Sequence, residues 1–218
     1  MIALRRTPEV TTDMSTTADI IDEKLVDPDP IKQFQNWFQT ASEANLPLPE
    51  AMSLSTVSRD GKPSSRMVLL KRVDQEGFVF FTNYLSSKAK DLENNNNAAL
   101  VFFWPQLERQ VRVEGTVTKT TVAESREYFA SRPRGSQIGA WASPQSQIIS
   151  SRSELEHRQA QIEELYRDRE IDCPENWGGF CLRPERMEFW KGRSDRLHDR
   201  IVYVRGADSS WSIKRLAP

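Results

Sequence analysis

The sequence has few cysteines, few histidines and no long apolar stretch. Two cysteines and two histidines among 218 residues are too few for a disulfide framework or a histidine-rich metal centre, so no metal site is expected. No run approaches the roughly 20 apolar residues of a membrane span. The N-terminus also lacks the apolar segment of a secretory signal. We therefore expect a cytoplasmic protein that binds neither metals nor membranes.

An excess of charge of one sign and a glycine-rich phosphate motif are also lacking. Lys and Arg number 30 and Asp and Glu 31, giving a formal net charge of −1. This balance argues against a protein that coats nucleic acid. The nine glycines form neither a dinucleotide-binding G-x-G-x-x-G pattern nor a P-loop. Any bound phosphate must therefore be held by arginine and lysine side chains.

The chain does contain enough apolar material for one large domain. Hydrophobic residues make up 38% of it and charged residues 28%, which is typical of globular proteins. Residues 1–28 are polar and acidic and are predicted to form a flexible N-terminal arm. The single domain is predicted over residues 29–218.

Hydrophobic periodicity predicts mainly antiparallel β-structure with a few helices. Helices are expected at about 30–44, 87–93, 121–131 and 153–169, the last with Leu155, Ile162, Leu165 and Tyr166 on one face. Strands are expected at 51–57, 64–73, 78–82, 98–104, 109–120, 178–183, 186–191, 200–205 and 211–215. Asp29 should cap the first helix, and Thr121 with Glu124 should form a capping box. Short strands joined mostly by hairpins predict an antiparallel barrel decorated with helices.

Two clusters of polar residues are candidates for a functional site. Arg66 and Lys71 stand at the two ends of an apolar strand segment. Thr82 to Lys88 combine hydroxyls with a lysine at the start of a helix, where backbone N–H groups and the helix dipole favour negative charge. Solvated strand ends and ordinary helix capping are the alternatives for these two clusters.

Two further clusters lie later in the chain. Tyr128, Arg132, Arg134 and Ser136, followed by Gln145 and Ser146, supply several hydrogen-bond donors of the kind that hold phosphate; arginines at a surface helix end are the alternative. In the fourth cluster, Arg196, His198 and Arg200 alternate and are predicted to share one face of an extended strand. Three cationic groups on one face favour an anion between them.

These segments together resemble one family. Glu188-Phe189-Trp190 followed by Arg196-Leu197-His198-Asp199-Arg200 is similar to the C-terminal signature of pyridoxine/pyridoxamine 5'-phosphate oxidases. Other segments resemble the family in the same order: residues 66–71, 80–83, 108–111, 131–133, 136–140, 177–179 and 215–218. The resemblance extends from about residue 29 to the end.

The resemblance implies an FMN-binding split β-barrel that works as a homodimer, with the flavin between subunits. It gives cofactor contacts on one subunit to Arg66, Met67, Val68, Leu69, Leu70, Lys71, Phe81, Thr82, Ser87, Lys88 and Gln110, and on the partner to Gln145, Ser146, Trp190 and Arg200. It gives the substrate phosphate to Lys71, Tyr128, Arg132 and Ser136, and the pyridine ring to the catalytic pair Arg196 and His198.

The implied reaction is oxidation of pyridoxine 5'-phosphate or pyridoxamine 5'-phosphate to pyridoxal 5'-phosphate, with O2 as acceptor and H2O2 as product, in vitamin B6 biosynthesis and salvage. Another flavin reductase on the same barrel and a flavin- or pyridoxal-phosphate-binding carrier are the alternatives. Two departures from the family pattern stand out. Ser87 occupies a position that usually carries arginine. The first tyrosine is Tyr84, so an N-terminal Arg-x-x-Tyr lid is absent or built differently, with Arg5 and Arg6 as candidates by composition alone.

Overall fold

The computed structural model describes residues 21–218. Arg5, Arg6 and most of the predicted arm lie outside the described residues. The remaining residues of the predicted arm, 21–28, pack against the C-terminal strands. Ile21 is buried, and the hydroxyl of Tyr203 donates a hydrogen bond to the carbonyl oxygen of Asp27 (2.7 Å). This part of the predicted arm is therefore in contact with the domain.

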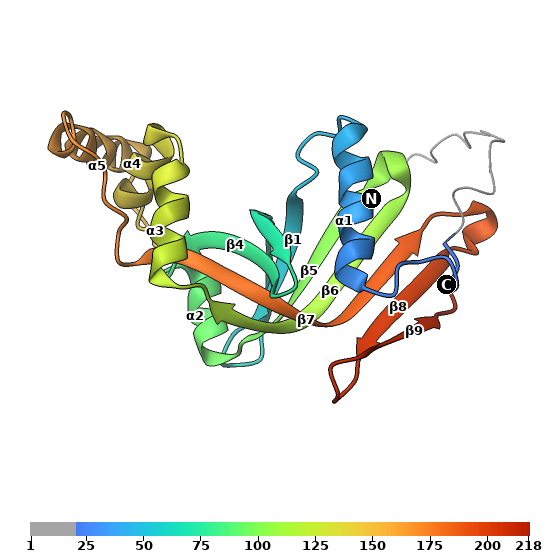
Figure 1. Cartoon of the computed structure of the whole chain (residues 1–218). Helices are drawn as coiled ribbons and strands as arrows, with labels where there is room; N and C mark the ends of the chain where they lie inside the picture. Colours follow the sequence, from blue (N-terminus) through green and yellow to red (C-terminus); the bar gives the residue numbers. More distant parts are fainter. Residues whose placement is uncertain (1–20) are drawn as a thin grey trace, which may run out of the picture.

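One antiparallel sheet runs through the whole molecule and curls around the core (Figure 1). Its strands are β1 (Ala51–Val57), β2 (Pro63–Leu69), β3 (Arg72–Asp74), β4 (Gly77–Asn83), β5 (Asn97–Trp104), β6 (Arg109–Lys119), β7 (Trp177–Lys191), β8 (Asp199–Arg205) and β9 (Trp211–Arg215). The strand order is β2-β1-β5-β6-β7-β4-β3, and β8 and β9 extend the sheet from β7. The predicted antiparallel split-barrel fold is confirmed.

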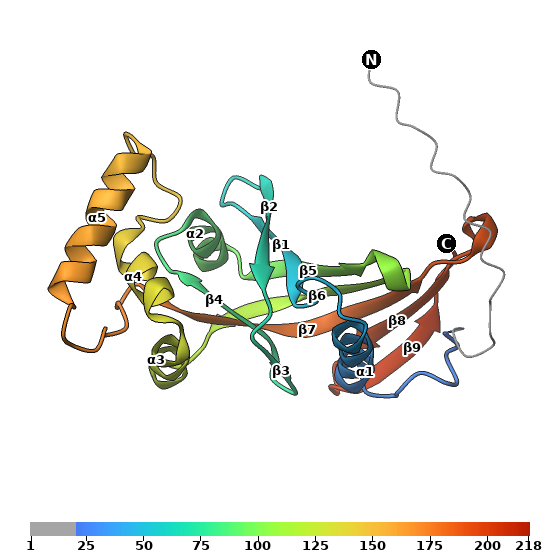
Figure 2. The same cartoon turned by 90° about the horizontal axis from the view of Figure 1, so that it is seen from above.

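Five helices of the described chain surround the sheet: α1 (Pro30–Glu43), α2 (Ser87–Asn94), α3 (Val122–Ser131), α4 (Arg134–Ala142) and α5 (Arg152–Leu165). The Asp29 side chain accepts a hydrogen bond from the backbone of Ile31 and so caps α1, as predicted. The capping box of Thr121 and Glu124 is also confirmed. Figure 2 shows α3, α4 and α5 gathered at one end of the molecule, away from α1.

Aromatic packing fixes α1 against the sheet. Phe34 is fully buried, and its ring lies 4.9 Å from that of Phe78 and 4.8 Å from that of Phe102. Aromatic contacts at these distances stabilise a core beyond the apolar area that they bury. The core therefore lies between α1 and the concave face of the sheet.

The strand β7 has two different neighbours along one edge. Its first half pairs with β4 as far as Leu182, and its second half pairs with β8 from Arg186 onward. Two separate strands were predicted here because proline disfavours strand interiors, but β7 continues through Pro184, where the pairing with β6 is irregular next to Gly115. A bulge accommodates the proline. The prediction of two strands is wrong.

Two other sequence predictions are wrong at their ends, and one helix was missed. The expected strand 64–73 ends at Leu69 because the next residues turn from β1 toward β4. Helix α4 was not predicted, since its glycines weaken the helical pattern. Helix α5 ends at Leu165 and not at 169; Ile162 and the following Tyr166 pack in a small core cluster with Trp177, whereas Leu165 is exposed.

None of the helices within residues 21–218 is long and apolar enough to span a membrane. The cytoplasmic location stays a prediction.

Candidate functional site

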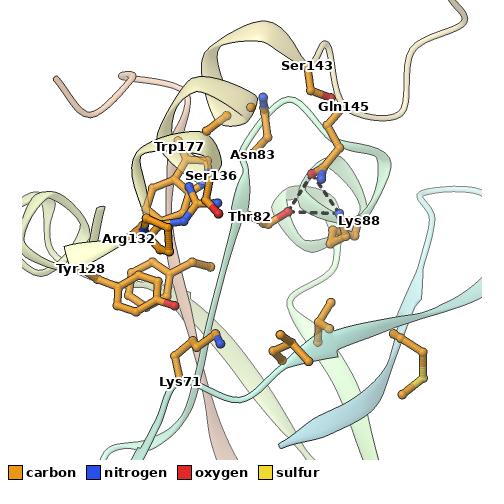
Figure 3. A pocket seen from close by; sticks show the side chains of 17 residues that line it. Lys71, Thr82, Asn83, Lys88, Tyr128, Arg132, Ser136, Ser143, Gln145 and Trp177 are labelled. Carbon is orange, nitrogen blue, oxygen red and sulfur yellow. Dashed lines mark hydrogen bonds between the residues drawn. The ribbon is translucent and has the colours of Figure 1, made fainter. Parts of the chain in front are cut away.

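A cavity of about 600 Å³ opens between β2, β4, α3 and α4. Figure 3 shows its polar side chains in two clusters: Tyr128, Arg132 and Ser136 on one side, and Thr82, Lys88 and Gln145 on the other. The lining residues are Met67, Val68, Leu69, Lys71, Phe81, Thr82, Asn83, Lys88, Tyr128, Arg132, Pro133, Ser136, Gly139, Ala140, Ser143, Gln145 and Trp177. The side chains predicted to contact the substrate phosphate therefore share one cavity with several of the predicted cofactor residues.

The bend after β2 directs Lys71 into this cavity. The backbone N–H of Leu70 donates to the carbonyl of Glu50 (2.9 Å), whereas that of Lys71 donates to the carbonyl of Val79 on β4 (2.8 Å). The chain thus exchanges one strand partner for another between two consecutive residues. Leu70 is buried in the core and Lys71 lines the cavity.

Lys88 is a buried cation surrounded by neutral acceptors. Its side chain is almost fully buried, and its Nζ donates to Thr82 Oγ1 (3.1 Å), Ser86 Oγ (3.3 Å) and Gln145 Oε1 (3.2 Å). Within residues 21–218 no carboxylate pairs with it. Burial lowers the pKa of Lys88, and the nearby positive charge of Arg66 lowers it further. A buried cation of this kind favours an anionic ligand.

Arg66 lies beside this cluster on β2. Its Nη1 donates to Thr56 Oγ1 (2.7 Å), and its Nη2 lies 3.8 Å from Asp91. Burial lowers its pKa, and Asp91 partly offsets the effect. Arg66 and Lys88 thus bring two positive charges to the same region.

Arg132 lies against the aromatic side chains of the other cluster. Its guanidinium lies 4.7 Å from the centre of the Trp177 ring, and burial lowers its pKa. Its Nη1 is buried and has no hydrogen-bond partner among the described residues. An unpaired buried donor is costly unless a ligand accepts its hydrogen bond. This atom therefore marks a position for an acceptor.

A stack of aromatic rings holds Tyr128 in place. Its ring lies 4.1 Å from that of Phe81, which in turn lies 5.4 Å from that of Trp177. Gly179, which pairs with Phe81 across the sheet, allows this approach. A Cβ atom at Gly179 would lie 2.9 Å from the Phe81 ring and 2.5 Å from Thr120 Oγ1. The glycine is therefore needed for the position of Phe81.

Several predicted residues lie instead at the far end of β7, on the opposite side of the molecule (Figure 1). We call Gln110, Trp190, Arg196, His198 and Arg200 the distal group. Gln110 faces Trp190 across β6 and β7, and Arg200 faces Trp190 across β7 and β8. The rings of Trp190 and His198 are 4.7 Å apart. The strand β7 has 15 residues, and at about 3.3 Å per residue its ends are roughly 45 Å apart along the chain.

The prediction that Arg196, His198 and Arg200 alternate along one strand is wrong. Residues Ser194–Arg196 form a short helical turn, and β8 begins only at Asp199. Asp195 and Arg196 have positive φ angles of 55° and 61°, which non-glycine residues adopt rarely. This turn, rather than strand alternation, sets the direction of Arg196.

Arg200 is held by a buried carboxylate that the sequence analysis did not single out. Glu188 is 2% exposed, and its Oε1 accepts from Nε (2.9 Å) and contacts Nη2 (2.8 Å) of Arg200. Its Oε2 lies 3.4 Å from Arg112 and 3.3 Å from Arg186. An acidic residue within the short apolar run of residues 187–190, two positions after Arg186, was the available signal.

Two of the predicted cofactor-binding residues lie in a different part of the chain's structure from the residues with which they were expected. Gln145, expected with Trp190 and Arg200, hydrogen-bonds Lys88 within the same chain. Gln110, expected with Phe81 and Thr82, belongs to the distal group. Ser87 and Ser146 are exposed. Two further residues line the cavity: Asn83, which belongs to the predicted cluster of residues 82–88 but was given no contact, and Ser143, which nothing in the local sequence distinguishes from an ordinary loop residue.

Two known family descriptions match successive parts of the chain. Residues 38–166 match the family described as pyridoxamine 5'-phosphate oxidase, and residues 177–218 match the pyridoxine 5'-phosphate oxidase C-terminal dimerisation region. The chain belongs to the pyridoxine/pyridoxamine 5'-phosphate oxidase family. The resemblance seen in the sequence is thereby confirmed, and the distal group, apart from Gln110, lies in the part that matches the dimerisation region.

Individual relatives are similar over most of their length. A pyridoxine/pyridoxamine 5'-phosphate oxidase of Acaryochloris marina is 54% identical over 196 residues, which is 90% of this chain and 89% of the relative. One of Burkholderia lata is 52% identical and covers 94% of this chain and 100% of the relative. Among solved structures, PhzG from Burkholderia lata, in complex with tetrahydrophenazine-1-carboxylic acid, matches with a TM-score of 0.86 and 28% identity, covering 92% of this chain and 98% of PhzG.

Proposed function

We propose that this protein oxidises pyridoxine 5'-phosphate or pyridoxamine 5'-phosphate to pyridoxal 5'-phosphate with bound FMN and O2, releasing H2O2. The observation that carries the proposal is a single cavity with two separate cationic clusters, one around Lys88 and one around Arg132. Two clusters suit two phosphate groups, one on the cofactor and one on the substrate. The names of the relatives support the same reaction.

The cluster around Lys88 fits the phosphate of FMN. Its ammonium has only neutral acceptors among the described residues, and Arg66 adds a second positive charge nearby. A phosphate group would accept hydrogen bonds from both cations and compensate for their burial. When bound, FMN supplies the redox chemistry, taking two electrons from the substrate and passing them to O2.

The cluster around Arg132 fits the phosphate of the substrate. Arg132 Nη1 lacks an acceptor among the described residues; Lys71, Tyr128 and Ser136 line the same cavity and can each donate a hydrogen bond. Arginine binds phosphate with two parallel hydrogen bonds and so fixes its orientation. These residues would hold the substrate by its phosphate and leave its ring free to face the flavin.

The distal group would complete the site from a second copy of the chain. One chain holds the cavity and the distal group at opposite ends of β7, so His198 and Arg196 cannot reach the cavity of their own subunit. A two-fold dimer places the same surfaces against each other reciprocally. Two exposed apolar side chains support this arrangement, namely Met67 at the cavity (64% exposed) and Leu197 in the distal turn (71% exposed).

In the completed site, Arg196 and His198 would contact the pyridine ring and its reacting substituent. Both side chains can donate hydrogen bonds to an oxygen or nitrogen of the substrate. They would hold the reacting carbon in position and polarise the group attached to it. Trp190 and Arg200 would contact the flavin from the same side.

Oxidation of a phosphate-free substrate is the competing function. The ligand named in the PhzG complex carries a carboxylate and no phosphate. The cationic cluster around Arg132 favours a phosphorylated substrate. A flavin protein whose substrate carries no phosphate group has no use for a second phosphate site.

The direct experiment measures flavin and peroxide in the purified protein. We expect a yellow protein whose released flavin is FMN, and H2O2 release on addition of pyridoxine 5'-phosphate. Pyridoxine without its phosphate serves as the matched control and should react far more slowly. FAD as the native flavin, or equal rates with both compounds, would contradict the proposal.

A hybrid dimer tests the shared site. Arg132→Ala and His198→Ala subunits are co-expressed with different affinity tags, and the hybrid is isolated. One of its two sites carries both substitutions and the other carries neither, so we expect about half of the wild-type rate at low substrate concentration. Each parent homodimer should be strongly impaired. A hybrid as impaired as its parents would show that both residues act within one chain.

A further inference from the structure

A continuous chain of ion pairs, ending in a backbone hydrogen bond, leads from the N-terminal segment to His198. Glu23 Oε2 accepts from Arg215 Nη2 (2.7 Å), and Arg215 Nη1 donates to Asp199 Oδ1 (2.8 Å). Asp199 Oδ2 accepts from Arg193 Nε (2.7 Å), and the backbone N–H of Arg193 donates to His198 Nδ1 (3.0 Å). We call these five residues the Asp199 chain. It joins residues that lie far apart in the sequence.

The last hydrogen bond of the Asp199 chain defines the tautomer of the neutral imidazole. A backbone N–H can only donate, so Nδ1 of His198 must be the unprotonated nitrogen that accepts. In the neutral ring the proton then lies on Nε2, which becomes a donor. The ring itself packs against Trp190, with ring centres 4.7 Å apart. His198 therefore has a defined orientation and a defined donor atom.

The pair of Arg193 and Asp199 also closes the turn that carries Arg196. The two residues stand on either side of residues 194–198, and their side chains are only 20% and 15% exposed. Between them, Asp195 and Arg196 are consecutive residues with positive φ angles. Non-glycine residues keep such angles only where the surrounding structure holds them. The bridge from Arg193 to Asp199 is the contact that holds both ends of this turn.

The N-terminal segment supports the carboxylate of Asp199 through Arg215. Arg215 Nη2 donates to the carbonyl of Ile21 (3.0 Å) as well as to Glu23. The contact with Glu23 raises the pKa of Arg215, and Asp199 adds to the effect. Residues 21–23 thus orient the guanidinium that fixes one oxygen of Asp199, while the other oxygen holds Arg193.

We propose that Asp199 is a positioning residue that sets the tautomer and orientation of His198 and the conformation of the turn carrying Arg196, and that Arg215 and Glu23 support it. The role of His198 in oxidation rests on the proposed function, but its orientation does not. The effect of Asp199 on the imidazole can therefore be tested separately from the reaction.

The first experiment is 15N NMR of the imidazoles in the full-length protein as purified. The sequence contains only two histidines, and His157 is exposed on α5, so it serves as an internal control. At alkaline pH, where imidazoles are neutral, His198 should show one protonated Nε2 and one unprotonated Nδ1. In Asp199→Asn the two His198 signals should move toward each other as the tautomers mix, while those of His157 stay unchanged. Unchanged His198 signals in Asp199→Asn would overturn the proposal.

The second experiment measures kinetics and flavin content. Asp199→Asn should lower kcat/KM about a hundredfold, the scale expected when a reacting group is misplaced by about an ångström, with FMN content unchanged. Glu23→Gln removes a more exposed contact and should lower kcat/KM about twofold to fivefold. In the double variant, kcat/KM should be no lower than in Asp199→Asn alone, because both residues act through the Asp199 chain. Independent, multiplicative effects would contradict the chain.

Two further variants keep the test decisive. If Asp199→Asn does not fold, Arg215→Gln interrupts the chain at its more exposed part, and Arg215→Lys should restore part of the His198 spectrum. Glu156→Gln is the matched control, since it breaks the exposed pair with Arg152 (3.0 Å) on α5 and should change neither spectrum nor rate. A shifted His198 tautomer with full oxidase activity would support the positioning role and contradict the proposed role of His198 in the reaction.

Discussion

The two ends of β7 both carry arginine and lysine, but they use these residues differently. At the cavity end, Lys88 and the Nη1 atom of Arg132 are buried without a carboxylate partner among the described residues. At the distal end, Arg200 and Arg193 are each held by a carboxylate, from Glu188 and Asp199. Unpaired buried cations create a demand for an anion, whereas paired cations fix geometry. The cavity end thus keeps buried cations available to an anionic ligand, whereas the named cations of the distal end are already paired.

The largest effect should follow from removing a carboxylate at the distal end. Glu188→Ala leaves Arg200, Arg112 and Arg186 without their shared buried partner. Loss of one member of a buried ion pair costs about 3–5 kcal/mol, and we expect a decrease of that size in the free energy of unfolding, measured by urea denaturation. Glu114→Ala is the control, because Glu114 contacts the same Arg112 and Arg186 but is 37% exposed. Equal losses for the two variants would show that the burial of Glu188 adds nothing to the strength of its ion pairs.

Removing a cation at the cavity end should affect binding and leave stability largely intact. Arg132→Ala deletes the contact that we propose to the substrate phosphate; such a contact is made equally in the ground and transition states, so its loss should raise KM with little change in kcat. A charge-assisted hydrogen bond contributes about 1.5–3 kcal/mol, which corresponds to an increase in KM of roughly 10- to 100-fold. Steady-state kinetics with pyridoxine 5'-phosphate measures it. A fall in kcat alone would place Arg132 elsewhere in the mechanism.

Lys88 sharpens the comparison further, because removing its charge should stabilise the protein. Burial lowers its pKa below the ordinary value of 10.5, so the charged form is disfavoured by folding at neutral pH. We expect Lys88→Met to raise the Tm of the flavin-free protein by about 2–4 °C, the shift produced by about 1 kcal/mol in a chain of this size, while weakening FMN binding.

The pH dependence of this difference has a definite sign. The pKa of Lys88 is lower in the folded chain than the ordinary value of 10.5. The protein therefore loses stability as pH falls from 10.5 through the folded pKa, and regains it as pH rises back toward 10.5. The Tm gap between Lys88→Met and the wild-type protein should therefore be largest near neutral pH and close as pH approaches 10.5. Calorimetry at several pH values measures it, and a gap that widens with pH would contradict the assignment.

The smallest effect concerns Ser87, at the first position of α2. Ser87→Arg adds a third cation to the cluster of Arg66 and Lys88, so FMN should bind more tightly, by up to about tenfold for one solvent-exposed charge-assisted contact. A positive charge at a helix N-terminus costs a few tenths of a kcal/mol, which limits the gain. Fluorescence titration of the flavin-free protein with FMN provides the measurement. Unchanged affinity would show that the site is already saturated with donors.

Local patterns in the sequence predicted the elements well, because each depends on near neighbours. The cap at Asp29 and the capping box at Thr121 are examples. The cavity depends on contacts between distant residues, such as the hydrogen bond of Lys88 to Gln145, and no spacing in the sequence encodes them. The resemblance to a family placed both residues near FMN but assigned Gln145 to the partner subunit.

The failures at the distal end have a different cause. Alternating polar residues at 196, 198 and 200 match the period of a strand, but backbone angles at Asp195 and Arg196 break the period. The alternation of polar and apolar residues in a strand does not reveal which non-glycine residues adopt positive φ angles. Glu188 was noticed as part of a family signature, but its role was not predicted because its partners come from three strands, β6, β7 and β8.

Because β7 is continuous, its number of residues sets the distance between the cavity and the distal group. Inserting or deleting one residue would move one end by about 3.3 Å and turn every later side chain to the opposite face of the sheet. Trp177 and Trp190 could then no longer face their present neighbours together. Evolution and engineering can therefore change the residues of β7 far more freely than their number. The irregular pairing beside Pro184 is the place where an added residue would be best tolerated.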